Sequence, residues 1–157
     1  MNRRAGDGQG PRAKEKGPAA AMSAAGLNIS LCDDGALQRA YIKLILQDYE
    51  SRCGVRFNLY EFSSGEELLE KFNQNPKLFD LFFLDHRMKN ITGLETASYI
   101  RKRNKVCHIV FVTASEEQED FAAVSPLRVL TKPAQPAAIW DILDKVSAEK
   151  ISPSHSG

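Results

Sequence analysis

The stretch Leu81-Phe82-Phe83-Leu84-Asp85 holds four consecutive large apolar residues and ends at a carboxylate. Such a run, with Asp80 before it and the polar turn 86–92 after it, is typical of a short parallel strand buried on both faces of a sheet. In open parallel sheets the ligand crevice lies beyond the carboxyl ends of the strands, so we expect Asp85 in that crevice. Because an aspartate also stops strands and caps turns, the role of Asp85 depends on what the rest of the chain supplies.

Composition indicates one globular domain of ordinary size. The chain has 157 residues, of which 43% are hydrophobic and 26% charged, and its formal net charge is +1. This balance gives no overall electrostatic reason to expect binding to nucleic acid or to a membrane surface. No apolar run approaches the ~20 residues that span a bilayer. The three cysteines lack zinc spacing and an even count, so we expect a reduced, cytoplasmic protein.

The chain divides into three expected segments. Residues 1–26 are rich in Gly, Ala, Pro and basic residues without periodicity, which predicts a disordered leader or a cloning remnant. Residues 27–150 carry the periodic patterns and form the predicted domain. Residues 151–157 are predicted to be a loose tail, and nothing after Lys150 could fold into an output domain.

Five predicted strands alternate with five predicted helices. The strands are expected at 27–32, 55–60, 81–84, 108–113 and 128–131, and the helices at 37–53, 65–75, 93–103, 116–124 and around 139–146. Parallel strands need helical crossovers, so this alternation predicts an α/β doubly wound domain with helices on both faces of a parallel sheet. The flavodoxin-like strand order 2-1-3-4-5 fits best, because the most apolar strand is third in the chain and would be central.

Sequence signals also predict how the helices begin and which sides they bury. Ser64 with Glu67, and Thr92 with Glu95, have the spacing of capping boxes. The first helix is predicted to bury a stripe of Leu37, Tyr41, Leu44, Ile45 and Asp48 and to stop at Gly54; the last is predicted to bury Ile139, Ile142, Leu143 and Val146. The helix at 116–124 opens with Ser115-Glu116-Glu117-Gln118, is acidic and has few apolar residues, so we expect it to be the least stable.

In the predicted fold the carboxyl ends of four strands meet at one edge. They carry Asp33-Asp34, Asp85, Thr113-Ala114 and Lys132-Pro133. Clustered carboxylates repel one another unless a cation neutralises them, and an all-oxygen site suits Mg²⁺, which leaves positions for phosphate oxygens. We therefore predict a Mg²⁺ (or Mn²⁺) site in which Asp85 is a nucleophile for phosphoryl transfer, with Thr113 and Lys132 contacting the phosphoryl group and Ala114 leaving room for it.

With these residues the chain resembles the receiver domain of two-component response regulators, over roughly residues 27–147. The resemblance aligns Asp33 and Asp34 with the acidic pair of that family, Asp85 with its phosphoacceptor, Met88 and Gly93 with residues of the following loop, Thr113-Ala114 with its hydroxyl and small residue, and Lys132-Pro133 with its lysine and usually cis peptide. It implies that the metal also binds the backbone carbonyl of Arg87. The 86–92 loop and the second strand resemble receivers that precede LytTR-type DNA-binding domains.

The resemblance also implies partners and a mode of action. A sensor histidine kinase or phosphotransfer protein would donate the phosphoryl group in a phosphorelay, and the domain would catalyse only its own phosphorylation and dephosphorylation. A homodimer would form through the face of the fourth helix, fifth strand and fifth helix, with no binding to nucleic acid or membrane. Two positions depart from the family: Lys89 replaces a frequent proline, and Val129 replaces a frequent aromatic residue, which argues against the usual aromatic switch.

Three other classes of protein are alternatives to a phosphoacceptor receiver domain. A flavodoxin-like phosphate or small-molecule binder needs a Gly/Ser/Thr-rich loop after the first strand, where this chain has two carboxylates. A haloacid-dehalogenase-like phosphatase needs a second aspartate where this chain has Arg87. A degenerate receiver that acts only as a protein-interaction module would not retain every position of the site. We expect His86, His108, Phe121 and Trp140 to be structural or surface residues.

Overall fold

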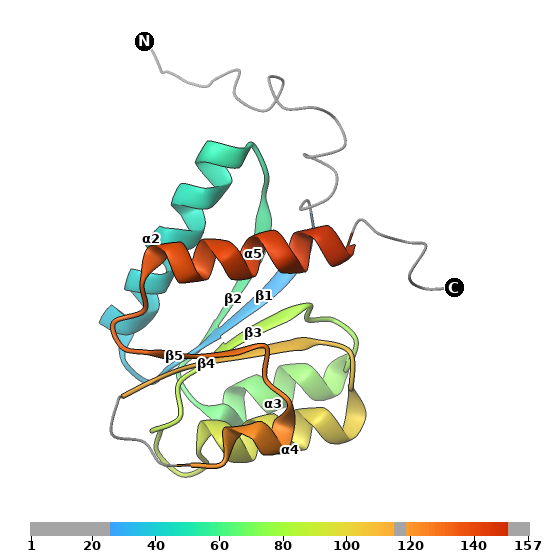
Figure 1. Ribbon diagram of the computed structural model, residues 1–157. Helices are drawn as coiled ribbons and strands as arrows, with labels where there is room; N and C mark the ends of the chain where they lie inside the picture. Colours follow the sequence, from blue (N-terminus) through green and yellow to red (C-terminus); the bar gives the residue numbers. More distant parts are fainter. Residues whose placement is uncertain (1–25, 115–118, 151–157) are drawn as a thin grey trace.

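The computed structural model describes residues 26–114 and 119–150, and these residues form a three-layer α/β fold (Figure 1). The elements are β1 (Leu27–Cys32), α2 (Ala36–Cys53), β2 (Phe57–Phe62), α3 (Gly65–Gln74), β3 (Leu81–Leu84), α4 (Gly93–Arg103), β4 (His108–Thr113), the 3-10 helix η2 (Phe121–Val124), β5 (Arg128–Thr131) and α5 (Pro136–Lys150). The five strands are parallel in the order β2-β1-β3-β4-β5. The predicted fold class and strand order are therefore confirmed.

Two apolar layers enclose the sheet. In Figure 1, α2 and α5 cover one face, and α3 and α4 cover the other. All four residues of β3 are buried, two against each layer, since Leu81 and Phe83 belong to the α2/α5 cluster and Phe82 and Leu84 to the α3/α4 cluster. This two-sided burial is what the uninterrupted apolar run predicted.

The first helix buries a different stripe from the predicted one. Its buried residues are Ile42, Ile45, Leu46 and Tyr49, whereas Leu37 and Leu44 are 84% and 66% exposed. The prediction was wrong for these two leucines and for Asp48, which is also exposed. The helix carries apolar residues on two adjacent faces, and packing on β1 and α5 selects the other face. The predicted stop at Gly54 is confirmed by its left-handed backbone, with φ of 69°.

The predicted helix caps and the predicted buried stripe of the last helix agree better with the structure than the stripe of α2 does. Thr92 and Glu95 form a complete capping box at α4. At α3, Ser64 accepts from the Glu67 amide, but the Glu67 carboxylate reaches the amide of Ser63, one residue earlier than the box motif predicted. The predicted stripe of α5 is entirely buried.

The helix predicted at 116–124 is not present over the part that the structure describes. Glu119 and Asp120 are not helical, and η2 is a single 3-10 turn; the predicted cap at 115–118 lies outside the described residues. The acidic, apolar-poor sequence explains the shortening, because such a segment buries too little apolar surface to support an α-helix.

Most residues at the two ends of the chain lie outside the part that the structure describes. Of the predicted leader only Gly26 is described, and the predicted tail 151–157 also lies outside the described residues. Within 26–114 and 119–150, no helix is long and apolar enough to cross a membrane.

Candidate functional site

Three carboxylates meet at the carboxyl edge of the sheet. Asp33 and Asp34 follow β1 and Asp85 follows β3, and one oxygen of each lies within 4.8 Å of the other two. The adjacent strands hold these positions, because the amide of Asp33 donates to the Phe62 carbonyl at 3.1 Å and the amide of Asp85 donates to the Cys32 carbonyl at 3.0 Å. Asp85 is 5% exposed, while Asp34 lies at the surface.

Lys132, directly after β5, reaches into this cluster. Its Nζ lies 3.1 Å from Asp33 Oδ2 and 3.1 Å from Asp85 Oδ1. The Lys132 amide donates to the Thr113 carbonyl at 2.8 Å, which fixes the end of β5 beside the end of β4. The Lys132–Pro133 peptide is cis, as predicted. The sheet thus brings the ammonium group of Lys132 to a carboxylate 99 residues earlier in the sequence, Asp33, and to that of Asp85, which follows the central strand.

Asp33 is oriented by its own turn. The Gly35 amide donates to Asp33 Oδ1 at 2.8 Å, and the Arg39 guanidinium donates to the Asp33 carbonyl at 2.6 Å. With Lys132 on Oδ2, both Asp33 oxygens have a donor. Asp33 is therefore held in place from both sides, whereas Asp34 faces solvent.

The electrostatics of the site follow from burial and close charges. Burial and the negative charge of Asp33 raise the pKa of the Asp85 carboxyl above its usual range, and Lys132 opposes this rise. Burial lowers the pKa of Lys132, but its hydrogen bond to Asp33 and the charges of Asp33 and Asp85 outweigh it, so the pKa of Lys132 is raised overall. The lysine is thus firmly charged, and a further cation would relieve the repulsion between the carboxylates.

The Thr113 hydroxyl is the third kind of group at this edge. Thr113 is 4% exposed, and its Oγ1 has no hydrogen-bond partner among the described residues. A buried hydroxyl without a partner costs free energy, so its presence points to a group that it would bind. Ala114, next in the chain, is partly buried and adds no bulk beyond a methyl group.

The loop after Asp85 is held by His86, whose role the sequence did not reveal. The His86 carbonyl accepts from the Gly93 amide at 2.8 Å, and His86 Nδ1 accepts from the Leu94 amide at 3.3 Å. The His86 ring packs edge-on against Phe121 at a centroid distance of 5.2 Å. His86 is thus a structural residue, as predicted, but one that links the residue beside Asp85 to α4 and η2. Only the spacing of the loop could have suggested this.

The other singled-out residues make structural contacts. His108 Nε2 lies 2.8 Å from Glu149, and Trp140 packs on Tyr49 at a centroid distance of 5.2 Å. Met88 lies in the loop after Asp85, and its Sδ is 3.7 Å from the Cys32 thiol. The metal-ligand role of the Arg87 carbonyl stays a prediction.

The donor set suits a hard divalent cation. Asp33, Asp34 and Asp85 supply only oxygen atoms, and they form the one group of three or more potential ligand side chains found in residues 26–114 and 119–150. Asp33 and Asp85 are close enough to share one ammonium group, which shows that both can face one positive charge. The residues present therefore fit Mg²⁺ or Mn²⁺.

The fold and this edge define a regulatory α/β domain of the response-regulator class. The model of the family "Response regulator receiver domain" matches residues 29–144, so the chain belongs to that family and is a receiver domain of two-component signalling. Receiver domains bind Mg²⁺ at an acidic pocket, and this chain has a cluster of three aspartates. Receiver domains also interact with histidine kinases or phosphotransfer proteins.

Individual relatives are similar at a moderate level. A Haloferax volcanii protein, named as a transcriptional regulator, is 28% identical over 119 residues, which are 69% of this chain and 20% of that protein. The chain thus spans about a fifth of the length of this relative. The response regulator TrrA of Thermotoga maritima, solved with Mg²⁺ and BeF, is 26% identical with a TM-score of 0.65, covering 76% of this chain and 98% of that one. The chemotaxis protein CheY4 of Vibrio cholerae is 24% identical with a TM-score of 0.63, covering 78% and 99%, and shares the fold.

Proposed function

We propose that this receiver domain accepts a phosphoryl group on Asp85 in the presence of Mg²⁺. The observation that carries the proposal is the position of Lys132 Nζ, 3.1 Å from Asp85 Oδ1 and 3.1 Å from Asp33 Oδ2, inside a group of three carboxylates. Phosphoryl transfer to a carboxylate needs a buried nucleophile, a fixed positive charge and room for the phosphoryl oxygens. Asp85, Lys132 and the small residue Ala114 would supply these.

Each residue of the site has a definite task in the proposed transfer. One Asp85 carboxylate oxygen attacks the phosphorus atom while the bond to the donor breaks, and the donor leaves with that electron pair. Lys132 would move from Asp85 to a phosphoryl oxygen and offset its charge. The free Thr113 hydroxyl would donate to another phosphoryl oxygen.

Asp33, Asp34, Asp85 and the Arg87 carbonyl would hold the metal. When bound, Mg²⁺ would offset the negative charge that accumulates among these carboxylates and the phosphoryl oxygens. Asp33 is already oriented by Gly35 and Lys132, so the metal would need little rearrangement of this side chain. Exposed Asp34 would contribute an adjustable ligand.

The signal would leave the site through the segment after β4. Phe121 of η2 packs on Phe111 at a centroid distance of 4.4 Å and on His86, so a shift of Thr113 or His86 would be felt at η2. Position 129, where the family often has an aromatic residue, is a valine that is 45% exposed. It has no aromatic ring, so the burial of a ring at this position cannot be the switch. We infer that η2 and the described residues before it, Glu119 and Asp120, reposition on phosphorylation and remodel a surface for a partner.

The phosphoryl donor, the cellular location and the dimer are proposed by analogy with the family. The donor would be a sensor histidine kinase or a phosphotransfer protein, and the chain would work in the cytoplasm without acting on any other substrate. The homodimer through α4, β5 and α5 is part of the same proposal. The alternatives have less support, because a phosphate binder would place its anion against three carboxylates, and a pure interaction module has no need of Lys132 in this position.

The test is the intact mass of the chain after incubation with acetyl phosphate. The wild type should gain one phosphoryl group with Mg²⁺ and none with a chelator. Asp85→Asn should gain none under either condition, while Asp34→Ala should respond more slowly and need more Mg²⁺. A phosphoryl gain by Asp85→Asn equal to the wild type would refute the proposed acceptor.

A further inference from the structure

Residues 132–134, the turn that joins β5 to α5, are tied to α2 by one side chain. The Tyr41 hydroxyl donates to the Ala134 carbonyl at 2.6 Å, across 93 residues of sequence. Tyr41 lies on α2, and Ala134 lies between the end of β5 and the start of α5. Ala134 is 1% exposed, so water has little access to its carbonyl if the Tyr41 hydroxyl is removed.

Two hydrogen bonds hold this turn, one at each end. The Lys132 amide donates to the Thr113 carbonyl at 2.8 Å, so β4 holds the start of the turn. Pro133 has no amide N–H to donate and is exposed. Among the described residues, the bond from Tyr41 is the one hydrogen bond found at Pro133 and Ala134. The far end of the turn therefore depends on Tyr41.

The position of this turn matters because Lys132 contacts two carboxylates at once. Its Nζ lies 3.1 Å from Asp33 Oδ2 and 3.1 Å from Asp85 Oδ1. A lysine side chain is long and flexible, so the backbone from which it starts decides which oxygen atoms the ammonium group can reach. A shift of the turn would therefore move Lys132 relative to both carboxylates.

Helix α2 also holds the other half of this ion pair. The Arg39 guanidinium, two residues before Tyr41, donates to the Asp33 carbonyl at 2.6 Å. Both side chains extend from one helix of 18 residues. Arg39 and Tyr41 thus hold backbone on the two sides of the contact between Asp33 and Lys132.

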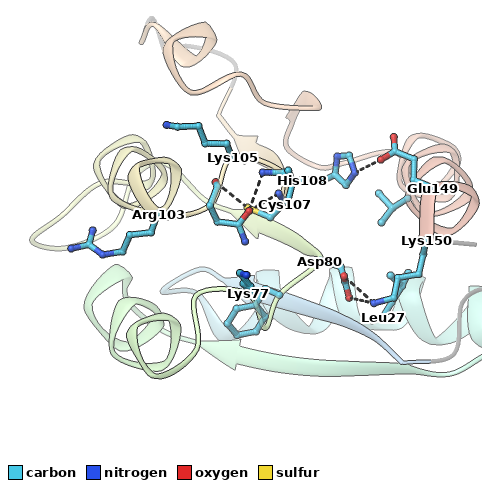
Figure 2. Close-up of a pocket in the computed structure, with 13 residues that line it drawn as sticks. Leu27, Lys77, Asp80, Arg103, Lys105, Cys107, His108, Glu149 and Lys150 are labelled. Carbon is cyan, nitrogen blue, oxygen red and sulfur yellow. Dashed lines mark hydrogen bonds and ion pairs between the residues drawn. The ribbon is translucent and has the colours of Figure 1, made fainter. Parts of the chain in front are cut away.

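Other contacts hold α5 in place without Tyr41. Figure 2 shows two of them at the opposite edge of the sheet, where Lys150 donates to Asp80 at 3.1 Å and Glu149 lies 2.8 Å from His108. The apolar stripe of α5 is also buried. Loss of the Tyr41 hydroxyl should therefore release the 132–134 turn and leave α5 docked.

We propose that Tyr41 is a positioning residue for phosphoryl transfer to Asp85 and that it acts through Lys132. This inference rests on the proposed phosphoacceptor function. The Tyr41 hydroxyl holds the 132–134 turn, and the turn holds the lysine at the distance from which its ammonium group can pass to a phosphoryl oxygen. The aspartates that would hold the metal do not depend on this hydrogen bond, because Gly35 and Arg39 orient Asp33.

The experiment compares rates of phosphorylation by acetyl phosphate at saturating Mg²⁺, followed by intact mass. Tyr41→Phe keeps the ring, removes the hydroxyl and should slow the reaction roughly tenfold. Tyr49→Phe is the matched control, because it removes the same group from the same helix, where it donates to Asp144 at 2.7 Å. This control should keep the rate within about twofold of the wild type. A small donor excludes any effect on the docking of a partner protein.

A double-mutant cycle separates positioning from a general loss of packing. In a Lys132→Ala background, Tyr41→Phe should change the remaining rate by less than about twofold, because the residue through which it acts is gone. Hydrogen exchange in EDTA gives a readout without phosphorylation. The Lys132 amide should exchange about fivefold faster in Tyr41→Phe and at the wild-type rate in Tyr49→Phe.

Each contrary result has a definite meaning. A wild-type rate in Tyr41→Phe would overturn this inference alone, whereas a wild type that gains no phosphoryl group would overturn the proposed function together with it. Equal slowing by Tyr41→Phe and Tyr49→Phe would show a loss of packing between α2 and α5 instead of positioning. A tenfold effect of Tyr41→Phe that persists without Lys132 would show that Tyr41 does not act through the lysine.

Discussion

Gly93 lies directly against the backbone of Asp85. A β-carbon at residue 93 would lie 2.9 Å from the Asp85 carbonyl carbon and 2.9 Å from the α-carbon of His86, and closer still to the Asp85 carbonyl oxygen. These neighbours are backbone atoms that cannot move aside. The close packing of the first residue of α4 therefore fixes the backbone position of Asp85, the residue proposed to accept the phosphoryl group.

Gly93→Ala should displace the Asp85 loop and destabilise the domain by about 1–3 kcal/mol. Urea unfolding in EDTA measures the stability, and the acetyl phosphate assay measures the effect on Asp85. Gly35→Ala is the control, since its β-carbon would meet only side-chain atoms at 3.3 Å. A loss of stability no greater than that of Gly35→Ala would contradict the packing argument.

Asp85→Asn should raise the urea midpoint of the metal-free protein at neutral pH. Burial and Asp33 raise the pKa of Asp85, so ionisation of this group costs folding free energy above its folded-state pKa. Below the ordinary value of 3.8 the carboxyl is protonated in both states and the cost disappears. The difference between the two proteins should therefore shrink as the pH falls through the acidic range. If Asp85→Asn is instead less stable than the wild type at neutral pH, the attraction between Lys132 and Asp85 outweighs burial and the repulsion between Asp33 and Asp85.

Arg101→Ala should cost about 2 kcal/mol or more and loosen η2. The Arg101 guanidinium donates to the carbonyls of Val124 and Cys107 at 2.7 Å each and to that of Ser125 at 3.1 Å. It thereby ties α4 to η2 and β4, and hydrogen exchange at Phe121–Val124 should accelerate. Arg103→Ala is the matched control on the same helix and should cost no more than about 1 kcal/mol. Equal costs for the two variants would be evidence against the proposed anchor.

Thr113→Val separates the two expected effects of the Thr113 hydroxyl. Because Oγ1 has no partner among the described residues, valine should leave the unphosphorylated domain at least as stable, with a gain of up to about 1 kcal/mol. The same variant should lose the change in hydrogen exchange at 119–124 that Mg²⁺ and beryllofluoride produce in the wild type, whereas Thr113→Ser should keep it. A full response in Thr113→Val would exclude the hydroxyl as the link.

Sequence reasoning predicted the sheet because its signals are local and strong. The run 81–84 permits no exposed face, and the alternation of five apolar segments with helical patterns allows few topologies. The candidate site followed from the topology, since strand ends far apart in sequence meet at one edge of a parallel sheet. The sequence alone therefore places Asp33, Asp85 and Lys132 at one edge, where the structure has them in contact.

The errors arose where several local solutions have similar energies. Helix α2 has two adjacent apolar faces, and only packing against β1 and α5 exposes Leu37 and Leu44. Glu119 and Asp120 lie in an acidic segment with too little apolar surface, and the predicted helix is not present at these two residues. The link through His86 depends on the fold of the loop, which brings the Gly93 and Leu94 amides back to residue 86. Whether the chain resembles receivers of LytTR-type proteins stays a prediction.

The most direct measurement of the central claim is the chemical location of the phosphoryl group. An aspartyl phosphate is an activated acyl group, so borohydride reduces it to homoserine and leaves free carboxylates unchanged. After incubation with acetyl phosphate and Mg²⁺, reduction and peptide mapping, we predict homoserine at position 85 and at no other position. Homoserine at position 33 or 34 instead, or a phosphoryl mass gain that yields no homoserine, would contradict the assignment of Asp85.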